Sequence, residues 1–213
     1  EVVLVSILID DSGSIRFAGN SQVVRDGHNM VVEALKGGKQ SGNVLMHTRY
    51  LNGFILFPYC LIKEAVMMDS HNYDPDKGTP LYDQAVVLLG TVMAKAQEFA
   101  DNGVPVRTVS LIITDGHDEH SRKILSPSGV APLVKNMLMA ESHIIAAMGI
   151  DDGGRTDFRQ IFQEMGVEDK WILTPKNTAK EIRAAFSLFS SSAVRASQST
   201  AHFSQTALGG VCR

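Results

Sequence analysis

The sequence predicts an α/β fold with an open, mostly parallel sheet that is covered by helices on both faces. Three observations predict it. Short runs that are almost wholly apolar and β-branched alternate with longer segments of helical periodicity. An Asn-Gly pair at 52–53 separates two strand-like runs, which indicates one antiparallel hairpin. The chain has 213 residues, of which 44% are hydrophobic, enough for one domain with a sizeable core.

The predicted strands differ in how much of them is expected to be buried. The first, residues 2–9, is nearly all apolar, so both of its faces should be covered. Residues 44–51 and 54–59 form the hairpin around Asn52-Gly53, because both turn residues tolerate a positive φ. Later strands are expected at 106–114, 143–150 and 171–173.

The predicted helices are bounded by capping residues. The helix at 21–36 ends at Gly37-Gly38. Thr79 fits an N-cap with Pro80 at the first helical position, and that helix ends at Asn102-Gly103. Thr178 and Glu181 form a capping box for the last helix. Two shorter helices are expected at 131–141 and 158–165.

We assign residues 1–190 to one α/β domain and residues 191–213 to a Ser/Ala-rich C-terminal helix or arm. Apolar residues from Phe186 through Phe203 to Ala207 keep a helical spacing in this tail. The last helix therefore either continues and packs, or gives way to a partly ordered arm. We expect the packed helix, because low-complexity linkers lack such a stripe.

Composition excludes several classes of function. The formal net charge is −3 and there is no basic block, which argues against a nucleic-acid or anionic-membrane surface. No apolar run of about 18 residues exists to span a membrane. Cys60 and Cys212 are too few for a disulfide framework, so we expect a cytoplasmic protein. The alternative is a secreted or surface protein, since the sequence begins at Glu1 and a signal peptide could precede it.

Polar residues gather where three predicted segments meet one edge of the sheet. Asp10, Ser12 and Ser14 follow the first strand, and Asp115 follows the strand at 106–114. Thr79 opens the second long helix. Ligands of such sheets bind beyond the carboxyl ends of the strands. Carboxylates and hydroxyls form an all-oxygen set, which suits hard cations such as Mg²⁺, Ca²⁺ or Mn²⁺.

Each of these segments also has an ordinary structural interpretation. The run from Asp10 to Ser14 could be a turn with an N-cap, and Asp115-Gly116 could be a plain turn. Thr79 taken alone is more often a cap than a ligand. Their coincidence at one edge of the sheet favours a metal site.

These residues resemble a von Willebrand factor type A domain with an intact metal-ion-dependent adhesion site. The family pattern is Asp-x-Ser-x-Ser after the first strand, a Thr before a later helix and an Asp after the fourth strand. Here it is filled by Asp10, Ser12, Ser14, Thr79 and Asp115, with the typical contexts Gly-Thr-Pro-Leu-Tyr and Thr-Asp-Gly. The chain is also similar to intracellular bacterial members of the family.

The resemblance implies a Rossmann-like, doubly wound sheet with the antiparallel strand at one edge. It implies that Ser12 and Ser14 bind Mg²⁺ directly, with Mn²⁺ or Ca²⁺ possible. Thr79 would bind directly or through water, and Asp10 and Asp115 mostly through water. A protein partner would supply the remaining ligand from an Asp or Glu, so the function would be adhesion and not catalysis.

Several alternatives stay open beside this interpretation. An Mg²⁺-dependent phosphatase-like hydrolase would use Asp10 but needs a second Asp where Ser12 stands. An accessory subunit of an ATPase or chelatase machine would use the same metal site. A zinc site at His117-x-x-His120 lacks further ligands by motif. The polar loops 69–78 and 116–121 should rim the metal, where they either select the partner or are simply solvated.

Overall fold

A six-stranded sheet with the order β3-β2-β1-β4-β5-β6 forms the centre of the molecule. The computed structural model describes residues 1–198 of the chain. Neighbouring strands are parallel except for β2 and β3, which form the antiparallel hairpin at one edge. The strands are β1 (Val2–Ile9), β2 (Val44–Tyr50), β3 (Ile55–Leu61), β4 (Val106–Thr114), β5 (His143–Gly149) and β6 (Ile172–Leu173).

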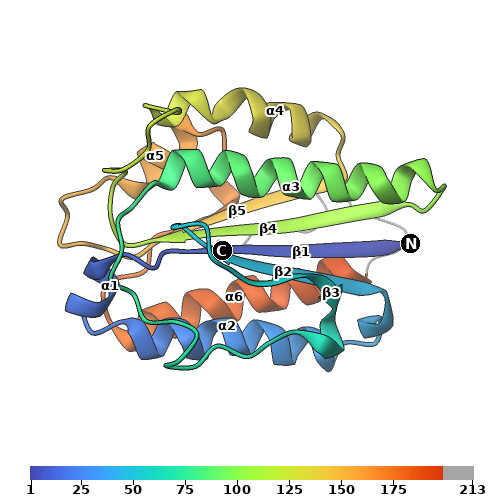
Figure 1. The fold of residues 1–213 in the computed structure, drawn as a ribbon, viewed down its shortest axis with the longest axis horizontal. Helices are drawn as coiled ribbons and strands as arrows, with labels where there is room; N and C mark the ends of the chain where they lie inside the picture. The colour runs from blue at the N-terminus through green and yellow to red at the C-terminus, as the bar shows by residue number, and fades with distance from the viewer. Residues whose placement is uncertain (199–213) are drawn as a thin grey trace.

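Helices cover both faces of this sheet (Figure 1). The helices α2 (Ser21–Lys36) and α6 (Ala179–Gln198) pack together on one face. The helices α3 (Leu81–Asp101), α4 (Ala131–Met139) and α5 (Phe158–Glu164) lie on the other. This arrangement confirms the predicted mostly parallel, doubly wound α/β fold with one antiparallel edge strand. No helix within residues 1–198 is long and apolar enough to cross a membrane.

The last helix continues to the end of the described chain. Phe186, Phe189, Ala193 and Ala196 are buried along it, so the helix packs against the rest of the domain as far as Gln198. The helix passes residue 190 without a break. The rest of the predicted stripe, including Phe203 and Ala207, lies outside the described residues.

The predicted start of α3 is wrong, and the predicted capping box of α6 is half formed. Pro80 and not Thr79 occupies the N-cap position of α3, because Asp118 and Ser121 from a distant loop accept the N–H groups of its first turn. At α6, Thr178 Oγ1 accepts the Glu181 N–H at 3.3 Å, which is one half of the predicted capping box. The Thr178 N–H donates instead to the Lys176 carbonyl.

A short helix that the sequence does not predict, α1 (Gly13–Phe17), follows directly after β1. A single turn carries too few residues to show a periodicity. The other predicted bounds agree with the observed ones to within two residues, a difference that is common at frayed ends. Cys60 is partly exposed on the edge strand β3.

Candidate functional site

The carboxylate of Asp10 joins the two central strands at the end where both finish. Asp10 is fully buried, and its Oδ1 accepts the Ser12 N–H at 2.7 Å. Its Oδ2 accepts the Thr114 hydroxyl at 2.7 Å and the Asp115 N–H at 3.3 Å. The pairing of β1 with β4 brings these residues together. Asp10 therefore fixes the backbone of both loops that carry the predicted ligands.

The hydroxyls of Ser12 and Ser14 and the carboxylate of Asp115 form a continuous hydrogen-bonded chain. Ser12 Oγ lies 2.8 Å from Ser14 Oγ, and Ser14 Oγ donates to Asp115 Oδ1. Ser12 is the N-cap of α1 and Ser14 lies in its first turn, so this short helix positions both hydroxyls. The chain of oxygens runs along one side of a pocket.

Thr79 lies on the same pocket and is buried. The loop before it is pinned beside Ser12, since the Gly13 N–H donates to the Lys77 carbonyl at 3.0 Å. The pocket has a volume of about 350 Å³. All of the predicted ligands except the buried Asp10 line it, and Asp10 stands behind them. The structure thus brings together all five residues that the sequence singled out: Asp10, Ser12, Ser14, Thr79 and Asp115.

Asn52 of the hairpin turn forms hydrogen bonds to two loops of the site, which the sequence does not predict. Asp11 Oδ1 accepts the backbone N–H of Asn52 at 3.1 Å and its side-chain Nδ2 at 2.8 Å. The same Nδ2 donates to the Gly78 carbonyl at 2.7 Å. Tyr73 Oη donates to the Asp10 carbonyl from within the loop 69–78. From the sequence, Asn52 is predicted only as a turn residue, because the Asn-Gly pair carries no information about side-chain contacts.

The pKa values of both aspartates of the site lie above the ordinary range of a carboxyl group. Burial raises the pKa of the Asp10 carboxyl. Burial and then the charge of Asp10 raise the pKa of Asp115 to about 7, against the opposing hydrogen bond from Ser14. A cation beside these carboxylates would offset both effects. The donors are all oxygens, which matches the ligand preference of Mg²⁺, Mn²⁺ and Ca²⁺.

The histidines of the following loop make other contacts. His120 Nδ1 accepts the Thr79 N–H at 2.9 Å, and His117 Nε2 lies 3.3 Å from Glu119 Oε1. Within residues 1–198 no group of three or more His, Cys, Asp or Glu side chains is arranged to hold a metal. The set at the pocket is of another kind, because it combines carboxylates with the hydroxyls of Ser12 and Ser14.

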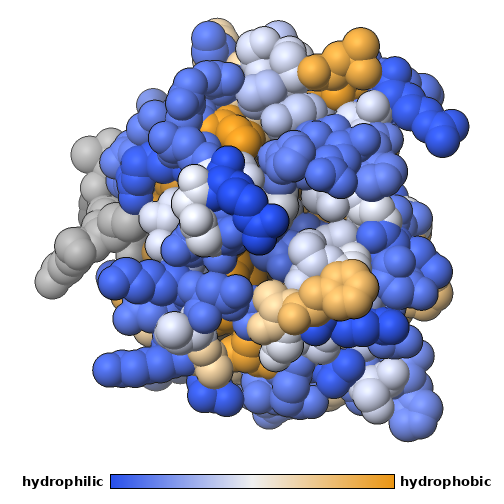
Figure 2. All heavy atoms as spheres, turned by 90° about the vertical axis from the view of Figure 1, so that its left-hand side faces the viewer, coloured by the Kyte–Doolittle hydropathy of each residue, from blue (hydrophilic) through white to orange (hydrophobic). Residues whose placement is uncertain are grey.

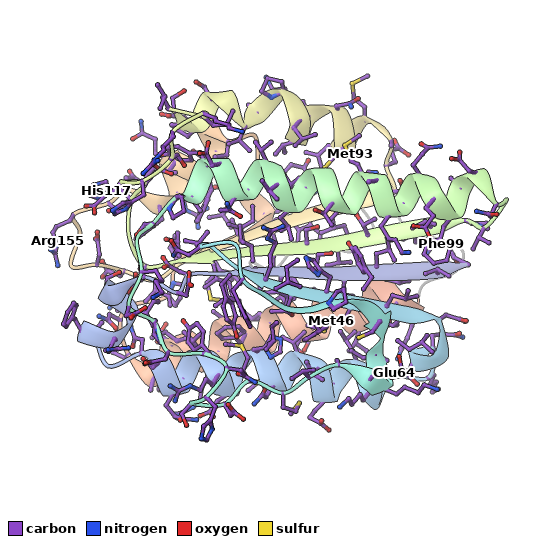
Figure 3. The ribbon with its side chains drawn as sticks, in the orientation of Figure 1. Met46, Glu64, Met93, Phe99, His117 and Arg155 are labelled. Atoms are coloured by element: carbon purple, nitrogen blue, oxygen red, sulfur yellow. The ribbon has the colours of Figure 1, made fainter. Side chains whose placement is uncertain are left out.

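A fourth segment, which the sequence does not predict to be part of the site, also reaches the pocket. Asp152 and Arg155, from the segment between β5 and α5, line the pocket beside His117. Figure 3 shows His117 and Arg155 at the same end of the molecule. Figure 2 looks onto this end, whose surface is largely hydrophilic with small hydrophobic areas. Only its position in the sequence could have pointed to this segment as part of the site. Asp151-Asp152 follows a predicted strand, as Asp10-Asp11 does.

Comparison with known proteins shows likeness only at the level of structure. No protein-family model matches the sequence, and no curated protein matches it. The pilus adhesin SpaC from Lactobacillus rhamnosus GG, in its open conformation, superposes with a TM-score of 0.65 at 12% identity, over 92% of this chain and 30% of that one. The chain therefore spans about a third of SpaC's length.

Two further structures carry informative descriptions. The vWF domain of the type V pili tip protein Mfa5 from Porphyromonas gingivalis gives a TM-score of 0.61 at 11% identity, covering 94% of this chain and 98% of that one. Proximal thread matrix protein 1 from the mussel byssus, with a zinc-occupied MIDAS motif, gives 0.53 at 17% identity, covering 88% and 47%. The chain has the fold of a von Willebrand factor A domain, as the sequence predicts.

Proposed function

We propose that this chain, with its von Willebrand factor A fold, is a non-enzymatic module that binds a protein partner through a divalent cation, foremost Mg²⁺. Ser12, Ser14 and Thr79 would hold the cation through their hydroxyls. Asp10 and Asp115 would act mostly through water. An Asp or Glu of the partner would complete the coordination. The observation that carries this proposal is the hydrogen-bonded chain from Ser12 through Ser14 to Asp115 on an open pocket.

The chemistry of the donors favours an exchangeable ligand from outside. Hydroxyl ligands are neutral, so they leave most of the charge of a divalent cation uncompensated. The carboxylate of Asp10 is fully buried behind the pocket and is engaged by hydrogen bonds from Ser12, Thr114 and Asp115. A cation held in this way would attract a further carboxylate, which the pocket volume of about 350 Å³ would accommodate.

The enzymatic alternative has less support at the same residues. A phosphatase of the type considered above needs an acid two residues after Asp10, where Ser12 instead shares its hydroxyl with Ser14. Use of the same site within an ATPase or chelatase machine is a variant of partner binding and would be tested by the same experiment with the partner added.

The location of the protein in or outside the cell is also part of the proposal. Two of the similar structures are described as a pilus adhesin and a pilus tip protein. They favour the surface or secreted alternative over the cytoplasmic setting that we expected from the cysteine content. The zinc-occupied MIDAS of the mussel protein supports a divalent cation in general and does not distinguish Mg²⁺ from other ions.

The test is calorimetric titration of Mg²⁺ and of Mn²⁺ into the wild type and the Ser12→Ala variant, with and without millimolar glutarate. We expect saturable binding by the wild type, tighter binding when the carboxylate is present, and loss of both in the variant. Ser128→Ala is the matched control, because Ser126 and Ser128 also form a hydroxyl pair, at 3.0 Å, and neither residue lines the pocket.

Equal binding by the wild type and Ser12→Ala would contradict the proposed ligands. Binding that glutarate leaves unchanged would contradict the bridging role while keeping a cation site. If the Ser128→Ala control lost binding too, the effect would come from general destabilisation and the assignment of Ser12 would fail.

A further inference from the structure

The loop between β4 and α4 is fastened to the start of α3 by reciprocal hydrogen bonds. Asp118 Oδ2 accepts the Tyr82 N–H at 2.9 Å, and Ser121 Oγ accepts the Asp83 N–H at 2.9 Å. In return, the Asp83 carboxylate accepts the N–H groups of residues 122–124, at 2.7 to 3.1 Å for the nearest oxygens. The first-turn N–H groups of a helix have no partner within the helix, so these contacts hold loop and helix together.

His120 lies inside this fastened loop and holds the backbone of Thr79. Its Nδ1 accepts the Thr79 N–H at 2.9 Å. The Thr79 carbonyl accepts the N–H groups of Glu119 and His120 at 3.2 and 3.4 Å. The imidazole also lies against Gly78, where an added Cβ would be 2.8 Å from the ring atoms Cγ and Nδ1. Both polar backbone groups of Thr79 are therefore bound to the loop.

We infer that His120 is a positioning residue, which fixes the Thr79 hydroxyl at the cation site without being a ligand itself. The inference rests on the proposed function, since it needs Thr79 to take part in cation binding. The Nδ1 lone pair is used by the Thr79 N–H, so the ring proton is on Nε2 and this nitrogen is not free for a metal. His120 and Thr79 are 41 positions apart in the sequence.

The size of the expected effect follows from the kind of contact. Residues that orient a metal ligand typically change metal affinity by 10- to 100-fold when they are replaced. His120 makes one side-chain hydrogen bond to the backbone of a neutral ligand, so we expect the lower end, a loss of about tenfold.

The experiment is calorimetric titration of Mg²⁺ into the wild type, His120→Leu, His120→Asn and His117→Leu. The Asn Oδ1 can accept a hydrogen bond at about the position of His Nδ1, so His120→Asn should restore most of the affinity that His120→Leu loses. His117→Leu is the matched control, because His117 lines the same pocket and is paired with Glu119 and not with Thr79. It should stay within about twofold of the wild type.

A second variant perturbs the same contact from the other side. In Gly78→Ala the new methyl group would displace the His120 ring, so Mg²⁺ affinity should fall although the imidazole is still present. The same substitution in the His120→Leu background should cause little further loss, since the more flexible side chain can move aside. Additive losses would show that Gly78 acts independently of His120 and would contradict the inference.

The outcomes separate the inference from the proposed function. If the wild type binds Mg²⁺ and His120→Leu binds it equally well, the positioning role is wrong and the cation site stands. If Leu and Asn at position 120 lose the same affinity, the effect is not due to the hydrogen bond and the inference fails. If the wild type takes up no Mg²⁺, the proposed function and the inference both fall.

Discussion

Acidification should destabilise this fold through His28, a fully buried histidine of α2. Its Nε2 lies 3.0 Å from Thr48 Oγ1 on β2, and its Nδ1 lies 3.1 Å from Asn29 Oδ1. Both of these partners are neutral. Burial lowers the pKa of His28 from 6.5 to about 4, although the hydrogen bond with Asn29 acts in the opposite direction.

The sign and the size follow from proton linkage. Between pH 6.5 and about 4 the unfolded chain binds a proton at His28 and the folded chain does not. The unfolded state is therefore favoured increasingly as the pH falls through this window. A pKa difference of about 2.5 units at about 1.4 kcal/mol per unit corresponds to a loss of about 3 kcal/mol by pH 4. The contribution is fully present above pH 6.5.

The assay is urea unfolding of the wild type and His28→Gln at pH 7.5 and pH 4. Other groups also titrate in this range, so the informative quantity is the difference in unfolding free energy between the two proteins. We expect this difference to shift by about 3 kcal/mol in favour of His28→Gln on acidification. His71→Gln, at a histidine whose side chain is 92% exposed, controls for the loss of one histidine.

A constant difference between the wild type and His28→Gln across this pH range would refute the reasoning. It would mean that His28 becomes protonated within the fold without cost, or that the unfolded chain does not gain the proton. A shift of the same size in His71→Gln would also refute it, because the effect would then not depend on burial.

Three further predictions concern packing, capping and the metal. Gly27→Ala should cost about 1–3 kcal/mol of unfolding free energy or more, because the added Cβ would lie 2.1 Å from the Phe186 ring. Urea unfolding measures this loss, and adding Phe186→Leu to the Gly27→Ala variant should recover part of it. Asp157→Ala removes the carboxylate that accepts the Gln160 N–H at 3.0 Å, and should cost about 1 kcal/mol by the same measurement, whereas Asp157→Ser should retain most of the stability. Saturating Mg²⁺ should raise the melting temperature of the wild type and leave that of Asp115→Asn unchanged, and an equal rise in both would count against Asp115 as part of the site.

The fold was predictable because its signals are local in the sequence. The run at 2–9 is apolar on both faces, which only a covered strand explains, and β1 has these bounds. Asn52-Gly53 predicted the hairpin, and Gly53 adopts the expected positive φ of 88°. Helix ends depended on distant contacts. Thr79 has the chemistry of a cap, but Asp118 and Ser121 occupy that role from another loop.

By itself, the sequence determined the α/β fold and the residues gathered at one edge of its sheet. Short apolar runs alternate with amphipathic ones, and parallel strands place Asp10 and Asp115 side by side. Only the tertiary structure shows which hydrogen bonds hold the loops at that edge in place. Asn52 bridges two loops, and His120 binds the backbone of Thr79. These contacts join residues that are tens of positions apart, and a hydrogen bond between distant residues leaves no periodicity or spacing in the chain from which it could be predicted.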